Sequence, residues 1–220
     1  MRCVIFDLDG TLADTSGDLI AAANACFKGL GHGKMLDPVT DMATAFAGGR
    51  AMLRLGFERL GAVDEAAIDR EFYHLLDHYQ ANIDRHTRLY PGAVEAVRQL
   101  RERGYSLGIC TNKPAYLAEK LLTRLGVRGL FGSMIGADTL PVRKPDPAPL
   151  FEAVRRAGGD PRRAVLVGDT VTDRETARAA GMPCLMVAFG PNGRAVEQMQ
   201  PEGLLEDYTG LHDAVQRLIG

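Results

Sequence analysis

The chain has 220 residues, 25% of them charged, and its formal net charge at pH 7 is −2. This length allows one domain, or a domain with a large insertion, around a substantial core. The near-neutral charge gives no electrostatic basis for binding nucleic acid or a membrane, and no apolar run is long enough to span a bilayer. Because Met1 leads directly into an apolar segment without a signal-like leader, we expect a cytoplasmic protein.

The first predicted element is a strand over residues 3–6, where four apolar residues are typical of a strand buried on both faces. Asp7 and Asp9 follow it and point the same way on an extended chain. Like charges on one face repel unless a cation or a proton lies between them. With Gly10 and Thr11 in a turn that can hold an anion, the segment predicts a divalent cation, magnesium, beside a phosphate. The alternative is a strand end capped by two solvated acids.

Between residues 15 and 85 the sequence predicts helices and no strands, because no segment there resembles a strand. The expected helices cover residues 16–30, capped by Ser16, a segment from about residue 38, a segment ending near residue 60, and residues 64–83.

From residue 89 onward, the pattern changes to strands that alternate with helices. The predicted strands cover residues 105–110, 133–137, 164–167 and 184–189. The predicted helices cover residues 91–103, 115–125, 147–157, 172–180 and 211–219, the last capped by Thr209. This alternation is typical of βαβ units, with a parallel sheet and right-handed crossovers.

The two patterns together predict an α/β fold, a doubly wound parallel sheet with an inserted all-helical domain. The α/β core comprises residues 1–14 and 86–220, and the insertion comprises residues 15–85. In sheets of this kind, ligands bind outside the carboxyl ends of the strands, so functional residues are expected there. Three of the four cysteines fall in strand-like apolar segments and none forms a Cys-x-x-Cys pair, so all are expected to be reduced, without a zinc site.

Polar residues follow three more of the predicted strands. Thr111 and Asn112 offer a hydroxyl and an amide to phosphate oxygens. Lys144 lies in a loop stiffened by prolines and supplies a positive charge held in place. Asp169 and Asp173 add two carboxylates at the start of a helix.

Each of these residues also has a simpler explanation. Thr111 and Asn112 suit an ordinary helix entry, and most lysines are solvated. Asp169 and Asp173 suit helix caps. Separate explanations do not account for polar groups at four strand ends of one sheet, so we favour a single site.

These segments resemble the four motifs of the haloacid-dehalogenase superfamily, in order and at the expected strand ends. The matching segments are Asp7-Leu8-Asp9-Gly10-Thr11, Thr111-Asn112, Lys144-Pro145 and Gly168-Asp169-Thr170-Val171-Thr172-Asp173. The helical insertion is similar to the cap domain of the phosphoglycolate phosphatase group, so the resemblance covers the whole chain. The motifs are specific for the superfamily and much less specific for substrate.

The resemblance implies a magnesium-dependent phosphatase that hydrolyses a small phosphomonoester, phosphoglycolate or a similar metabolite, through an aspartyl-phosphate. Asp7 would be the nucleophile, and Asp9 would act as general acid and then as general base. Magnesium (Mg2+) would be held by the Asp7 carboxylate, the Asp9 backbone carbonyl and Asp169. Asp173 would order its water shell.

The remaining motif residues would bind the phosphoryl group. Thr111, Asn112 and Lys144 would contact its transferring oxygens, where positioning and charge stabilisation do most of the catalytic work. As the resemblance has it, dehalogenases and phosphonate-cleaving members lack an aspartate at the second position. The presence of Asp9 therefore favours a phosphate ester with an alcohol product.

Substrate choice is expected to depend on the helical insertion. Within it, Gly48-Gly49-Arg50 offers a guanidinium that can bind a substrate carboxylate. The alternative is an exposed arginine at a helix start. The expected partner is a small phosphorylated metabolite, and the expected assembly is a monomer or homodimer.

Two other functions remain open from the sequence. A sugar-phosphate mutase of the β-phosphoglucomutase type shares the four motifs but keeps its phosphoaspartate from water. A non-catalytic binding protein on the same scaffold is less favoured, because every polar residue that the chemistry needs is present.

Overall fold

The computed structural model describes residues 1–220, which divide into two compact units. One unit comprises Met1–Asp14 and Leu89–Gly220, and the other is Thr15–Arg88. The predicted second boundary, between residues 85 and 86, lies three residues before the boundary in the structure.

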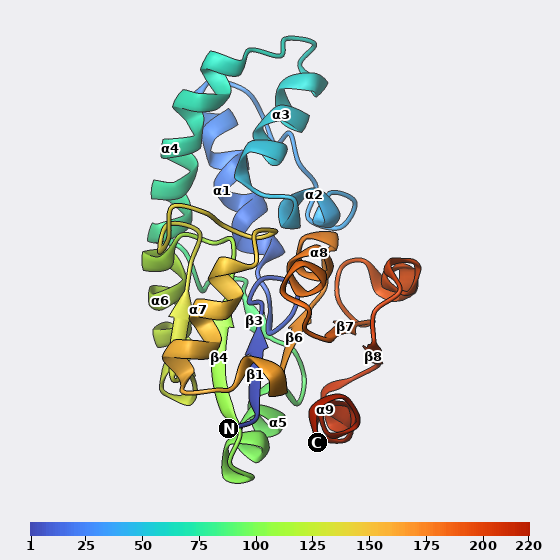
Figure 1. Ribbon diagram of the computed structural model, residues 1–220. Helices are drawn as coiled ribbons and strands as arrows, with labels where there is room; N and C mark the ends of the chain where they lie inside the picture. The colour runs from blue at the N-terminus through green and yellow to red at the C-terminus, as the bar shows by residue number, and fades with distance from the viewer. The chain divides into compact units, whose positions relative to one another are not determined.

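The larger unit is built on a six-stranded parallel sheet in the order β5-β4-β1-β6-β7-β8 (Figure 1). Its strands are β1 (Cys3–Phe6), β4 (Ser106–Cys110), β5 (Ser133–Ile135), β6 (Ala164–Gly168), β7 (Cys184–Val187) and β8 (Gly203–Leu205). Strand β1 pairs with β4 on one side and β6 on the other, so that Phe6 lies beside Ile109 and Val167. The predicted α/β fold class with a parallel sheet is confirmed.

Helices connect the strands and cover the sheet. They are α5 (Ala93–Glu102), α6 (Ala115–Arg124), α7 (Ala148–Ala157), α8 (Val171–Ala180) and α9 (Leu211–Ile219). Cys3 and Ile5 of β1 pack in one cluster with Leu150 of α7 and Ala177 of α8. Every residue of β1 and β6 is buried, and apolar burial of this kind contributes roughly 25 cal/mol per Å² of surface removed from water.

The smaller unit is helical, with α1 (Ser16–Gly29), α2 (Met42–Phe46), α3 (Gly49–Arg59) and α4 (Glu65–Ala81). Helix α1 packs against α4, and α3 packs against both. Ile68, Leu75 and Tyr79 of α4 are buried. The two-residue strands β2 (Ala13–Asp14) and β3 (Arg88–Leu89) form a separate small sheet. All the helices of the protein are too short or too polar to span a lipid bilayer.

The helix expected from residue 38 begins only at Met42, so that expectation was wrong. The Asp37 carboxylate accepts hydrogen bonds from the backbone N–H groups of Val39 and Thr40, each at 2.9 Å. Aspartate often bonds to backbone groups two or three residues ahead in this way, and the segment forms a turn instead of a helix.

Other details of the ends of elements also differ from the prediction. Thr15, not Ser16, is the N-cap of α1, and Asp207 caps the short 3-10 helix that precedes α9, where Thr209 was expected to act. Strand β8 was not expected, because its three residues lie beside Pro201 and are too few for a periodic pattern. The four cysteines are free, as predicted, and all four are buried.

Helices α1 and α3 approach closely at Gly56. A Cβ atom at this position would lie 2.1 Å from Cζ of Phe27, whose ring is fully buried. Alanine normally stabilises a helix by about 1 kcal/mol relative to glycine. We expect Gly56→Ala instead to destabilise the protein by about 1–3 kcal/mol, because the ring has no room to move.

The measurement is the urea midpoint of unfolding. Gly29→Ala is the matched control, because nothing lies within 4 Å of a Cβ at Gly29, at the exposed end of α1. The control should leave the midpoint unchanged or raise it. An equal gain in both variants would contradict the close helix contact.

Candidate active site

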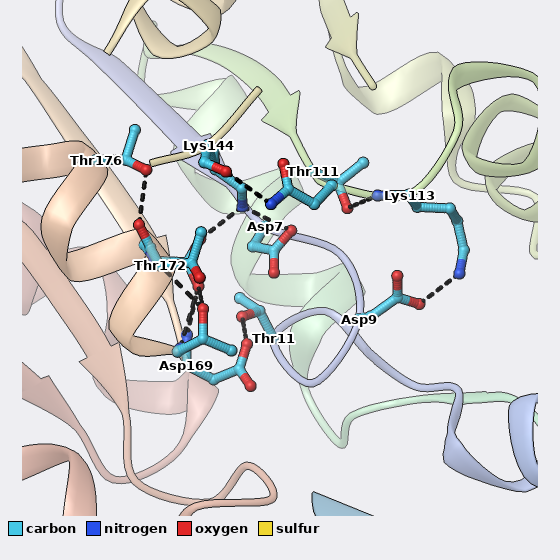
Figure 2. Close-up of polar contacts among 12 residues, drawn as sticks. Asp7, Asp9, Thr11, Thr111, Lys113, Lys144, Asp169, Thr172 and Thr176 are labelled. Atoms are coloured by element: carbon cyan, nitrogen blue, oxygen red, sulfur yellow. Dashed lines mark hydrogen bonds and ion pairs between the residues drawn. The ribbon is translucent and has the colours of Figure 1, made fainter. Parts of the chain in front are cut away.

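Three carboxylates meet at the carboxyl ends of β1 and β6, and Figure 2 labels two of them, Asp7 and Asp169. Asp7 follows β1, Asp169 follows β6, and Asp173 lies in the first turn of α8. One oxygen from each lies within 4.8 Å of the others, and all three residues are buried. Because β1 and β6 are paired neighbours, residues from opposite ends of the sequence come together here.

Lys144 lies between two of these acids. Its Nζ is 3.0 Å from Oδ1 of Asp7 and 2.5 Å from Oδ1 of Asp173, and only 2% of its side chain is exposed. Burial alone would lower the pKa of Lys144, but the carboxylates of Asp173 and Asp7 outweigh burial and raise it. Lys144 is therefore a fixed buried cation, and the solvated-lysine interpretation is wrong for its position in the structure.

The polar residues after β4 hold the loops of the site. The side-chain amide of Asn112 donates a hydrogen bond of 2.9 Å to the backbone carbonyl of Lys144, which fixes the lysine loop. The hydroxyl of Thr111, which is buried, accepts a hydrogen bond of 3.2 Å from the backbone N–H of Lys113. The expected contacts of Thr111 and Asn112 with phosphate oxygens stay predictions.

Asp173 is held by a reciprocal helix cap. The backbone N–H of Thr170 donates to Oδ2 of Asp173 at 3.1 Å, and the backbone N–H of Asp173 donates to the Thr170 hydroxyl at 3.3 Å. The simpler explanation of Asp173 as a capping residue is therefore correct for one of its oxygens. The other oxygen binds Lys144, which a helix cap does not require.

Asp169 is held by the loop after β1. The Thr11 hydroxyl donates a 2.7 Å hydrogen bond to Oδ1 of Asp169, a contact that the sequence did not suggest. The second oxygen, Oδ2, is buried without a hydrogen-bond partner. A Cβ at Gly10, where φ is +81°, would lie 2.4 Å from that oxygen, so only glycine leaves it room. A buried carboxylate oxygen without a partner is costly and fits a cation ligand.

Asp9 has a different partner from the other acids. Its Oδ1 accepts a 2.8 Å hydrogen bond from Nζ of Lys113. Only 4% of the Lys113 side chain and 19% of the Asp9 side chain are exposed. The Lys113 side chain was not among the site residues predicted from the sequence. The sequence signal that pointed to Lys113 was its position, three residues beyond the end of the central strand β4.

The charges of the site favour a bound cation. Burial raises the pKa of Asp7 to about 6, because the effect of Lys144 in the opposite direction is smaller. Burial, followed by the charges of Asp173 and Asp7, also raises the pKa of Asp169. When Asp9 and Lys113 are included, four carboxylates face two ammonium groups, and one divalent cation would balance the excess.

Arg50 lies in the smaller unit, at the start of α3. Its guanidinium pairs with Asp69 and lies 4.6 Å from the centre of the Phe72 ring. About half of its side chain is exposed. These contacts explain its orientation within the unit, and its predicted contact with substrate stays a prediction.

Comparisons with known proteins show which family this chain resembles. The model of the haloacid dehalogenase-like hydrolase family matches residues 1–181. A phosphoglycolate phosphatase of Mesorhizobium japonicum is 39% identical over 98% of this chain and 96% of its own. The crystal structure of a predicted phosphoglycolate phosphatase from Haemophilus somnus 129pt is 25% identical, with a TM-score of 0.85 over 97% of each chain.

A further solved structure bears on the mutase alternative. It is a Thermotoga maritima protein described as a β-phosphoglucomutase, with a TM-score of 0.76 over 99% of this chain and 100% of that one. The two chains are 22% identical, so the likeness concerns the fold alone.

The raised pKa of Asp7 makes the stability of the metal-free protein depend on pH. A carboxyl whose pKa is higher in the folded chain binds more protons folded than unfolded. The free energy of unfolding should therefore fall as pH rises from the usual value of 3.8 through the folded value of about 6. If the deprotonated carboxylates bind Mg2+, as predicted, added Mg2+ should restore stability above that interval.

Thermal unfolding in chelator and in Mg2+, from about pH 4 to about pH 7, measures both effects. The decline should be smaller in Asp7→Asn, which carries no charge at that position. A stabilisation by Mg2+ that did not grow with pH would contradict this account of the site.

Proposed function

The chain belongs to the haloacid dehalogenase-like hydrolase family, and from that membership we propose that it is a magnesium-dependent phosphatase of small phosphomonoesters, phosphoglycolate or a similar metabolite. The observation that carries the proposal is the buried cluster of Asp7, Asp169 and Asp173 around Lys144. The substrate class is supported by the phosphoglycolate phosphatase that matches nearly the whole chain.

In the first proposed step, a carboxylate oxygen of Asp7 attacks phosphorus. A bond forms between that oxygen and phosphorus, and the bond from phosphorus to the ester oxygen breaks. Asp9 gives its proton to the departing oxygen, so the product leaves as an alcohol and not as an alkoxide. The positive charge of Lys144, fixed beside Asp7, offsets part of the negative charge gathered there.

In the second proposed step, water attacks phosphorus in the aspartyl-phosphate. Asp9, now a carboxylate, takes a proton from the water, and the bond between phosphorus and the Asp7 oxygen breaks. Inorganic phosphate leaves, and both aspartates return to their starting states. Thr111, Asn112 and Lys144 are the proposed donors to the phosphoryl oxygens.

The residues present fit a hard divalent cation, because the site offers carboxylate oxygens and one of them, Oδ2 of Asp169, is buried without a partner. Asp7, Asp169 and the backbone carbonyl of Asp9 would hold Mg2+, and Asp173 would order its water shell. The cation would reduce the repulsion between an anionic nucleophile and an anionic phosphate.

The mutase alternative has less support, because the β-phosphoglucomutase resembles this chain only in fold, whereas a phosphatase is 39% identical to it. A non-catalytic protein is disfavoured by the intact set of polar residues. The cap role of residues 15–85, a cytoplasmic location and a monomeric or homodimeric state stay predictions.

Phosphate release with Mg2+ over a panel of phosphometabolites tests the function. Asp7→Asn keeps the shape of the side chain but removes the nucleophile, and should lower turnover roughly 10⁴-fold or more. Asp77→Asn, on the exposed face of α4, is the matched control and should keep wild-type turnover. Isomerisation of a sugar phosphate faster than release of phosphate would favour the mutase.

The same panel tests the predicted role of Arg50. If its guanidinium binds a substrate carboxylate, Arg50→Ala should raise KM for acid-bearing esters about 10-fold and spare neutral ones. Arg54→Ala is the control, because it removes an exposed arginine on the same helix as Arg50, one that pairs with Glu65 of α4. Equal losses on acidic and neutral esters would remove the carboxylate hypothesis.

A further inference from the structure

The site contains two buried lysines that form ion pairs with different aspartates. Nζ of Lys144 lies beside Asp7 and Asp173, whereas Nζ of Lys113 donates to Oδ1 of Asp9 at 2.8 Å (Figure 2). The two lysines come from different places in the sheet, Lys113 from the end of β4 and Lys144 from the loop after β5. The proposed nucleophile and the proposed general acid therefore have separate cationic partners.

The backbone of Lys113 is fixed by close packing. Its N–H donates to the Thr111 hydroxyl at 3.2 Å, and its carbonyl accepts from the N–H of Ala137 at 3.0 Å. A Cβ at Gly136 would lie 2.8 Å from that carbonyl oxygen and 2.5 Å from backbone atoms of Ala115. The backbones of residues 113–115 and of Gly136 are therefore closely packed. This packing fixes the position of the Lys113 Cα atom, from which the side chain extends.

The Lys113 side chain is also confined along its length. Only 4% of it is exposed, although most lysines extend into solvent. Its charge therefore meets Asp9 in a setting with less water than a surface ion pair, where an ionic hydrogen bond is stronger and less screened. The ammonium is a fixed point to which Asp9 is bound.

Hydrogen bonds in the loop after β1 fix the backbone around Asp9. Gly10 donates its N–H to the carbonyl of Ala13 at 2.9 Å, and the Leu8 carbonyl accepts from the N–H of Leu12 at 3.0 Å. Two rotatable side-chain bonds still separate that backbone from the carboxylate of Asp9. The hydrogen bond from Lys113 restricts both.

We propose that Lys113 is a positioning residue that holds the Asp9 carboxylate in the orientation needed for proton transfer to the leaving oxygen and from water. This inference rests on the proposed phosphatase function. A general acid or base acts only within hydrogen-bond reach of the proton that it moves, and a displacement of about 1 Å lowers rates by up to about 10²-fold.

The test is a double-mutant cycle with phosphoglycolate as the substrate. Lys113→Met keeps the length and apolar body of the side chain and should lower kcat about 10- to 100-fold with little change in KM. Asp9→Asn should lower kcat about 10²- to 10⁴-fold. In the Asp9→Asn background, Lys113→Met should change kcat by less than about 2-fold, because the group that it positions is already lost.

Nitrophenyl phosphate separates the two chemical steps. Its leaving group departs without a proton, so Lys113→Met should leave formation of the aspartyl-phosphate nearly unchanged and slow its hydrolysis. A burst of about one nitrophenolate per enzyme should then precede the slow steady state. Lys34→Met, at an exposed lysine of the smaller unit, is the control and should retain wild-type kinetics.

Two results would overturn the inference while the wild-type chain remains an active phosphatase. The first is an unchanged kcat in Lys113→Met. The second is a Lys113→Met variant that lowers kcat by the same factor in the wild-type and Asp9→Asn backgrounds, because that result would indicate a role independent of Asp9. Lys113→Gln provides a second variant if Lys113→Met has a lowered melting temperature. A wild-type chain that releases phosphate from no ester would overturn the proposed function itself.

Discussion

The ammonium group of Lys144, bound between Asp7 and Asp173, is the interaction on which the site depends. Charged groups are costly to bury unless each has a partner, and the loss of one partner leaves an uncompensated charge. One lysine cannot neutralise two aspartates and Asp169 as well. The larger unit therefore keeps a local excess of negative charge in a buried place, which is the electrostatic condition for holding a divalent cation.

Close backbone packing maintains this arrangement. Part of this packing comes from residues after 181, beyond the segment 1–181 that the family model matches. A Cβ at Gly190 would lie 2.7 Å from the carbonyl oxygen of Gly10. The side-chain amide of Asn192 donates to the backbone carbonyl of Asp169 at 3.0 Å, and the Tyr208 hydroxyl donates to that of Thr11 at 2.7 Å. The C-terminal part of the chain thus supports both loops that carry the acids.

The sequence was sufficient to predict that the strand ends converge, because that follows from strand order and parallel pairing. It was not sufficient to predict which polar side chains bind one another. Asn112 was predicted only as a donor to phosphate, and the hydrogen bond from its side-chain amide to the Lys144 loop was not foreseen. Thr11 was assigned to an anion-binding turn, yet its hydroxyl binds Asp169. Such contacts depend on rotamers and on loop paths, which have no periodicity, and the short strand β8 was missed for the same reason.

The different exposures of the two motif aspartates after β1 match the different tasks proposed for them. The Asp7 side chain is 10% exposed and lies against a lysine that is itself buried, which suits a nucleophile that reacts best away from water. The Asp9 side chain is 19% exposed, which suits the role proposed for it, since a general acid and base must be reachable by the leaving alcohol and by water. A more exposed carboxylate gains more in orientation from a fixed cationic partner. A second lysine, anchored by its own backbone contacts, is therefore needed at Asp9 more than at Asp7.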